Sequence, residues 1–317
     1  MASIEDWKRA VPTHSEDPVH AEAADAMALM LKGEVGPEDT AKRIAEIYET
    51  ELKSNNDSPD MNDEEQVNHF WTYLICDAIF TFSSAEQHER LFDLLVAISK
   101  QPDVKTPNGS VKKYCDHDVY WRDLPGWSLS FATQASCEST PSHPFGDFAD
   151  INTPVYEKAH QWTEHWLEDY LNQAPRLLNG TKFAAMLLEK NVFTVNLPME
   201  ASDALKLGIE KLCTGESNHY INSIEAQVLL PATTTWLLVA GKMIYSHCLN
   251  NEIERYGADL KTRQGWGGGT WTIDRWEGWQ ERLHEIADHN DVNEECRDIA
   301  LKTLRKMAEI EAEHDSR

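Results

Sequence analysis

Apolar residues recur along most of the chain at intervals of three and four, the spacing of one face of an α-helix. The clearest early case is 37-PEDTAKRIAEIYETELKS-54, where four apolar side chains fall on one face. A helix before it is expected to start near Pro18, in the first-turn position that proline favours, and to stop near Gly33. The N-terminal part of the chain is therefore predicted to be helical.

Two more helices are expected before residue 100. The segment 63-DEEQVNHFWTYLICDAIFTF-82 is apolar nearly all round beyond its first turn, which is typical of a central, buried helix. Ser84 and Gln87 have the spacing of a capping box, so a helix is predicted over 85–99. The long polar connection that follows contains turn residues rather than a periodic pattern.

The second half of the chain shows the same helical periodicity and no convincing strand. Helices are expected at about 125–138, 154–173, 176–190, 201–213, 223–230, 231–251, 273–289 and 292–313. The predicted fold class is all-α, an irregular multi-helix bundle or a short α-solenoid of about eleven helices. No long linker divides the chain, so a single domain over 1–317 is predicted, with the helices of 15–100 packed on 115–314.

Charge narrows the classes of partner. The 317 residues include 29 Lys plus Arg and 54 Asp plus Glu, a formal net charge of −25. Such a chain repels nucleic acid and anionic membranes, so neither is an expected partner. The N-terminus has no apolar signal region and no long uncharged apolar run follows, so we expect a soluble, cytoplasmic protein.

The sequence carries no cofactor signature. The six cysteines are scattered without a CxxC pair, so reduced thiols are expected. No nucleotide, flavin, haem or iron–sulfur motif is found, and the prediction is no cofactor and no metal.

A glycine-rich stretch, 265-GWGGGTWTIDRWEGWQERL-283, raises the question of a phosphate site. A P-loop needs a lysine that this stretch lacks, and a dinucleotide fingerprint needs a preceding strand. The glycines are interpreted instead as a tight connection between helices. Thr272 is the predicted N-cap of the next helix, with Trp271 and Trp276 placed as a hydrophobic staple.

The same stretch carries a family resemblance. The segment Thr272-Ile-Asp-Arg-Trp-x-x-Trp-x-x-Arg282 resembles the closing signature of a fungal family labelled domain of unknown function 3632. Segments 119–125, 182–188 and 230–242 are similar to its W-x-D-L-P stretch, its apolar helix and its late Ala-Gly helix. The resemblance covers roughly residues 65–290 and implies a fungal source and an all-helical fold. It implies no activity and carries over no catalytic residue.

Two histidine-rich segments lie outside that pattern and are candidate catalytic segments. In 157-EKAHQWTEHWLED-169, His160 and Glu164 are i, i+4, so they share a helix face within hydrogen-bonding reach, a general-base arrangement. His165 lies beside Trp162 on a neighbouring face. The alternative is a structural helix with a tryptophan stripe in the core and a charged outer face.

The second segment is 115-CDHDVYWRD-123, where His117 stands between two aspartates ahead of Tyr120 and Trp121. A structural loop, an acid–base or ligand contact, and a metal site all stay open here. His247 falls on one face of a predicted helix with Trp236 and is interpreted as an inward-facing, hydrogen-bonded core histidine.

The aromatic inventory suggests a small-molecule site. The chain has 11 Trp, 9 Tyr, 9 Phe and 13 His, which suits an aromatic pocket for a flat, apolar molecule. We predict a cofactor-independent enzyme of fungal secondary metabolism, of isomerase or cyclase type. It would catalyse intramolecular conjugate addition on a phenolic or polyketide-like substrate, as chalcone isomerases do, or a pericyclic step.

The predicted site residues fall into two groups. The catalytic candidates are His160, Glu164, His165 and His117, and the substrate-binding candidates are Tyr120, Trp121, Trp162 and Trp166. The alternative function is a non-catalytic helical scaffold that binds a ligand or another protein, and a homo-oligomer stays open in either case.

Overall fold

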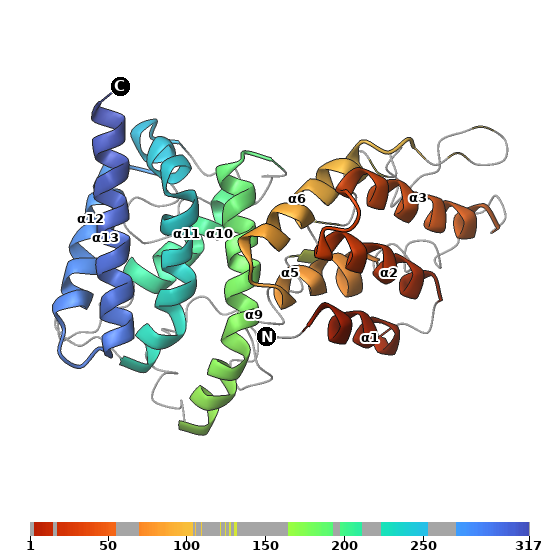
Figure 1. Cartoon of the computed structure of the whole chain (residues 1–317). Coiled ribbons are helices and arrows are strands. Elements are labelled where there is room, and N and C mark those ends of the chain that lie inside the picture. Colours follow the sequence, from red (N-terminus) through yellow and green to blue (C-terminus); the bar gives the residue numbers. More distant parts are fainter. Residues whose placement is uncertain are drawn as a thin grey trace. The chain divides into compact units, whose positions relative to one another are not determined.

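The computed structural model confirms the all-α fold class. It describes residues 3–14, 18–54, 70–103, 105, 109, 121, 124, 127, 130–131, 164–192, 197–210, 223–252 and 271–316. Within these ranges the regular elements are helices, and no strand occurs (Figure 1). None of the described helices is long and apolar enough to cross a bilayer.

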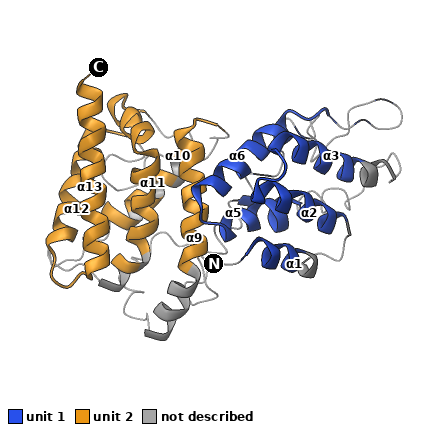
Figure 2. Cartoon of the chain, in the orientation of Figure 1, with its two compact units in different colours: residues 1–139 blue, residues 140–317 orange. Residues whose placement is uncertain are grey.

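The helices divide into two compact units, residues 1–139 and residues 140–317 (Figure 2). The prediction of a single domain, with the N-terminal helices packed on the rest, stays a prediction.

Unit 1 contains the N-terminal helices. They are α1 (Ile4–His14), α2 (Pro18–Lys32), α3 (Pro37–Ser54), a π-helical stretch η1 (Phe70–Cys76), α5 (Asp77–Thr81) and α6 (Ala85–Ser99). Three predictions are confirmed here: α2, α3, and the cap of α6, where Ser84 Oγ accepts a hydrogen bond from Gln87 N at 3.1 Å. Helix α1 was not predicted; it buries Trp7, whose ring lies 5.7 Å from that of Phe82.

The predicted buried helix over 63–82 is confirmed in its described part, but it is not α-helical throughout. Residues 70–76 form a π-helix, and only 77–81 form an α-helix. Five of the seven π-helical residues are buried, including Phe70 and Trp71. The wider π turn changes the hydrogen-bond register, which the apolar pattern does not encode.

Aromatic rings form the core of unit 1. Phe70 lies 5.0 Å from Tyr48, 4.6 Å from Trp71 and 6.2 Å from Trp121, as measured between ring centroids. Trp127 continues the cluster at 6.1 Å from Trp71. Tilted and edge-on ring pairs at these separations are favourable. The cluster therefore holds together several elements of unit 1.

Unit 2 contains the remaining described helices. They are α9 (Glu164–Glu189), α10 (Leu197–Leu205), the π-helical η2 (Lys206–Glu210), α11 (Ser223–Leu249), α12 (Ile273–Asp288) and α13 (Glu294–Asp315). Helix α11 packs against both α9 and α13, and α12 packs against α13 (Figure 1).

Two predicted helix boundaries in unit 2 are wrong because the helices do not break at their prolines; α11 is kinked instead at Ala240, where φ is −102° and ψ is 15°. Pro175 lies within α9 and Pro231 within α11, where breaks between two helices were predicted. An interior proline costs about 3 kcal/mol, but burial of α11 side chains such as Leu230, Leu237 and Ile244 offsets it. The predicted helix over 201–213 is also corrected, since α10 already starts at 197 and becomes π-helical after Leu205.

The π-helix η2 passes very close to α11. A side chain at Gly208 would collide with the side chain of Thr233, so Thr233 packs directly against the Gly208 backbone. Thr233 Oγ1 donates a hydrogen bond to Ala204 O at 3.1 Å. This contact fixes the direction of η2 and therefore the position of its last residue, Glu210.

The start of α12 follows the sequence prediction. Thr272 is the N-cap, and its Oγ1 accepts a hydrogen bond from Arg275 N at 3.2 Å. Four apolar side chains at helical spacing on α12 form a buried stripe: Trp276, Trp279, Leu283 and Ile286. The cap and stripe together fix which face of α12 points into unit 2.

Candidate functional site

A buried ion pair lies at the centre of unit 2. The side chains of Arg275, from α12, and Glu210, from η2, are only 3% and 4% exposed. Glu210 Oε1 accepts hydrogen bonds from Arg275 Nε at 2.9 Å, Arg275 Nη2 at 2.7 Å and Trp279 Nε1 at 2.9 Å. Arg275 Nη1 also donates to Ser202 Oγ at 3.2 Å. These bonds compensate the charges for the water that they lose on burial.

Two tryptophans complete the surroundings of the guanidinium group. The Arg275 Cζ atom lies 5.7 Å from the ring centre of Trp271 and 5.2 Å from that of Trp279. The negative faces of aromatic rings attract a cation, most strongly where water is excluded. The arginine is therefore held from several sides, and it joins α12 to η2.

A second polar pair lies next to Trp271. His247 Nδ1 and Glu252 Oε2 are 2.6 Å apart. His247 Nε2 is buried and has no hydrogen-bond partner among the described residues. In this pair, Nδ1 of the imidazole is hydrogen-bonded to the carboxylate, and Nε2 has no partner among the described residues.

The end of α11 explains why His247 meets Glu252. Glu252 N donates to His247 O at 3.1 Å and Asn251 N donates to Cys248 O at 3.2 Å, while Asn251 has a φ of 49°. This is the Schellman pattern, in which a residue in the left-handed conformation ends the helix. The pattern brings the side chains at its first and last positions together, and here they are a histidine and a glutamate.

Trp271 connects the two polar pairs. Trp271 N donates to Glu252 O at 2.9 Å, and its ring lies 5.9 Å from that of His247. The same ring faces the Arg275 guanidinium. We refer to His247, Glu252, Trp271, Arg275 and Glu210 as the unit 2 polar cluster.

The cluster has the parts of a general base. A carboxylate on Nδ1 favours the tautomer with a proton there and leaves a lone pair on Nε2. It also stabilises the imidazolium that forms when Nε2 accepts a proton. The nearby positive charge of Arg275 is paired with Glu210.

The described cysteines have no part in such chemistry. Burial raises the pKa of Cys248 to about 12 and that of Cys296 to about 11, and burial also raises the pKa of Cys76 well above its usual value. These thiols stay protonated at neutral pH and are poor nucleophiles. In the part of the chain that the structure describes, no group of three or more potential ligands could hold a metal ion.

Most of the sequence-predicted site residues lie outside the described residues. This holds for His117, Tyr120, His160 and Trp162 entirely. Glu164, His165 and Trp166 form the first turn of α9, but their side chains are outside the described part. Neither proposed histidine site is therefore tested by the geometry.

Trp121 is the predicted substrate-binding residue whose side chain is described. It is 1% exposed, and its ring lies edge-on to Phe70 in the core of unit 1. This position gives Trp121 a packing role, and its contact with a substrate stays a prediction.

The unit 2 polar cluster was only partly visible in the sequence. His247 was interpreted as an inward-facing, hydrogen-bonded histidine, and its side chain is 15% exposed and bonded to Glu252. Glu252 was missed, although 247-HCLNNE-252 places an asparagine pair just after a helix, a signal for a left-handed cap. No local signal joins Arg275 to Glu210, because they are 65 residues apart.

These features define an all-α protein with a carboxylate–histidine pair beside a buried arginine–glutamate pair. A family model described as a protein of unknown function (DUF3632) matches residues 71–283, and the chain belongs to this family. The matched range includes the unit 2 polar cluster and the Thr272–Arg282 segment that carried the resemblance. No curated protein matches the chain, and no solved structure matches it.

Proposed function

We propose that the protein is a cofactor-independent isomerase or cyclase that uses histidine acid–base catalysis on a small phenolic or polyketide-like molecule. The observation that supports this most is the His247–Glu252 pair, with Nδ1 bound to a carboxylate and Nε2 buried without a partner among the described residues. The proposal includes the fungal source, the role in secondary metabolism and the cytoplasmic location expected from the sequence.

The proposed reaction is an intramolecular conjugate addition. His247 Nε2 takes the phenolic proton, and Glu252 stabilises the resulting imidazolium. The phenolate oxygen then forms a bond to the β-carbon of the enone, and the π electrons of the C=C bond move to give an enolate. His247 returns the proton to the α-carbon, so the product is an isomer of the substrate and no co-reactant is needed.

Aromatic side chains have a separate role in this proposal. Ring contacts orient a flat substrate for closure, and orientation of that kind lowers the barrier to an intramolecular step. Trp271, which touches both polar pairs, is the described tryptophan best placed for this role. Tyr120, Trp121, Trp162 and Trp166 stay the ring-binding candidates proposed from the sequence.

The histidines proposed from the sequence are the rival acid–base groups. His160 with Glu164, His165 and His117 would perform the same proton transfers at a different place in the chain. Alanine variants at 117, 160, 165 and 247, assayed in parallel, distinguish these histidines. Only the histidine that acts as the base takes part in both proton transfers, so only its replacement should abolish turnover.

The experiment uses as its probe the ortho-hydroxychalcone with the hydroxyl on the aryl ring attached to the carbonyl, called ortho-hydroxychalcone below. The full chain is the enzyme. Spontaneous closure gives racemic flavanone, whereas closure in a chiral site gives an excess of one enantiomer. The expected result is a rate above that in buffer, with enantiomeric excess measured by chiral chromatography. Racemic product formed at the rate in buffer contradicts the proposal.

A non-catalytic helical scaffold is the second candidate function. It is favoured by one face of α13, where the exposed side chains of Glu294, Glu295, Asp298, Lys302 and Arg305 form no ion pair with another described residue. If the protein is a scaffold, it should bind a partner, and neither wild type nor any of the four histidine variants should turn over the substrate.

A further inference from the structure

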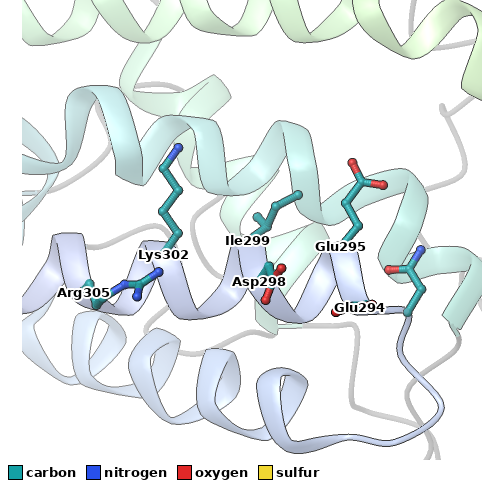
Figure 3. Close-up of a pocket in the computed structure, with 7 residues that line it drawn as sticks. Glu294, Glu295, Asp298, Ile299, Lys302 and Arg305 are labelled. Atoms are coloured by element: carbon teal, nitrogen blue, oxygen red, sulfur yellow. The ribbon is translucent and has the colours of Figure 1, made fainter.

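The outer face of α13 borders an open depression of about 780 Å³. Its described lining is Asn293, Glu294, Glu295, Asp298, Ile299, Lys302 and Arg305. Figure 3 shows Glu295, Ile299 and Lys302 pointing to the same side of the helix. Helix α13 begins at Glu294, so this face lies beyond the segment that matches the family model, 71–283.

The charges on this face are separated along the helix. Glu294, Glu295 and Asp298 occupy the N-terminal part, and Lys302 and Arg305 follow. Among these five residues, Asp298 and Lys302 are the one pair of opposite sign at i, i+4 spacing, which is the spacing that neutralises a helix surface.

None of these five side chains forms an ion pair with another described residue. Asp298 and Lys302 form no ion pair with each other, although their spacing of four residues would allow one. Their neighbours behave differently, because Lys306 pairs with Glu309 at 3.4 Å, and Arg282 of α12 pairs with Glu285. Among the described residues, the acidic patch and the basic patch of this face therefore lie side by side without ion pairs that neutralise them.

We propose that this face binds the same face of a second copy of the chain, with the two α13 helices antiparallel. Along the helix, the level of residue 300 is midway between 298 and 302 and also midway between 295 and 305. A two-fold axis that crosses the exposed face of α13 at this level relates the two copies. Each Asp298 then faces Lys302 of the second copy, and each Glu295 faces Arg305. The interface is isologous, since the same patch serves both copies.

The match of charges makes a second copy a better occupant than an unrelated protein. Each chain carries a net charge of −25, so two copies repel unless acids meet bases at the contact. The α13 face provides that arrangement on a single helix. A contact of one helix face is smaller than a standard interface of about 1,600 Å², so the dimer is weak and sensitive to salt.

Sedimentation velocity of the full chain over a range of concentrations tests this proposal. Wild type is expected to shift toward twice the monomer mass as concentration rises. Lys302→Glu/Arg305→Glu and Glu295→Lys/Asp298→Lys are each expected to stay monomeric, because each face then meets its own sign. An equal mixture of the two variants is expected to restore the dimer.

A matched control separates the face from total charge. Lys42→Glu/Lys182→Glu changes the net charge by the same amount as Lys302→Glu/Arg305→Glu, at two exposed lysines of α3 and α9. This control is expected to associate as wild type does. Circular dichroism of every variant checks that the helices are intact.

Three results would overturn the proposal. They are a monomeric wild type at all concentrations, a charge-reversed variant that associates as wild type does, and a mixture that stays monomeric. Turnover of ortho-hydroxychalcone is measured on the same samples. Failure of dimerisation and failure of the proposed function are therefore seen separately.

Discussion

Glu210 Oε1 lies 2.7 Å from Arg275 Nη2, and both side chains are almost inaccessible to solvent. The two residues are 65 positions apart in sequence, so their pairing fixes η2 against α12. A buried charge that loses its partner is far more costly than a pair left intact. The stability of unit 2 should therefore depend on the pair as a unit.

We predict that Arg275→Met lowers the free energy of unfolding by about 3–5 kcal/mol, because it leaves the Glu210 carboxylate buried and unpaired. Urea denaturation followed by circular dichroism measures this change. The double variant Arg275→Met/Glu210→Met should recover most of the loss, since no unpaired charge is left inside.

Arg282→Met on the same helix is the control for that prediction. The Arg282 side chain is 17% exposed, but its partner Glu285 is 55% exposed, so Arg282→Met leaves a carboxylate that water can solvate and a smaller loss is expected. Equal losses for Arg275→Met and Arg282→Met would contradict a special role for the buried pair.

Gly33→Ala should destabilise unit 1. Gly33 has a φ of +81°, where an L side chain is strained, and its new Cβ would lie 2.5 Å from Arg90 Nη2. That guanidinium cannot move freely, because Arg90 Nη1 donates to Met30 O and Leu31 O at the end of α2. We expect a loss of about 1–3 kcal/mol in the free energy of unfolding.

Gly36→Ala is the matched control for Gly33→Ala. A Cβ at Gly36 meets only Glu38 Oε2, at 3.8 Å, in ordinary contact. Thermal unfolding should show a clear drop in Tm for Gly33→Ala and little change for Gly36→Ala. If the two variants melt together, the Arg90 contact does not stabilise the end of α2.

The buried thiols predict a loss of stability in alkali. In the folded state the pKa of Cys248 is about 12 and that of Cys296 about 11, whereas an unfolded thiol has a pKa of about 8.5. A raised folded pKa means that the thiols contribute full stability below about pH 8.5 and progressively less as pH rises toward the folded values.

Urea titrations at neutral pH and near pH 10 measure that loss. The Cys248→Ala/Cys296→Ala variant should show a smaller drop between the two pH values than wild type, because two of the buried thiols are gone. An equal drop in both proteins would assign the alkaline loss to other groups. Thiol reagents should modify Cys76, Cys248 and Cys296 only after unfolding.

Much of the fold could be predicted, because helix caps and apolar spacing are local. Ser84 and Thr272 were identified as caps, and the buried stripe of α12 follows from its periodicity. The breaks expected at Pro175 and Pro231 were wrong, because tertiary packing overrides a local helix breaker. The π-helices were missed, since the apolar pattern does not specify the hydrogen-bond register.

The candidate site was harder to predict than the fold. Glu252 reaches His247 only through a left-handed turn at Asn251, which helical periodicity does not represent. Glu210 reaches Arg275 through the close approach of η2 to α11, a tertiary contact. Both pairs depend on where helices end, and helix ends are the least certain part of a sequence-based prediction.

Glu252→Gln should lower kcat for ortho-hydroxychalcone by about 10- to 100-fold, because the amide does not stabilise an imidazolium as a carboxylate does. KM should change little, since Glu252 acts through His247 and does not touch the substrate. A rise in KM with an unchanged kcat would assign Glu252 to substrate binding instead.

The most direct measurement of His247 as the general base is kcat for ortho-hydroxychalcone closure by His247→Ala, with and without added imidazole. General-base action predicts a loss of at least about 100-fold and partial recovery when imidazole fills the vacated space. A kcat equal to that of wild type, in a variant with an unchanged circular dichroism spectrum, would contradict the role of His247.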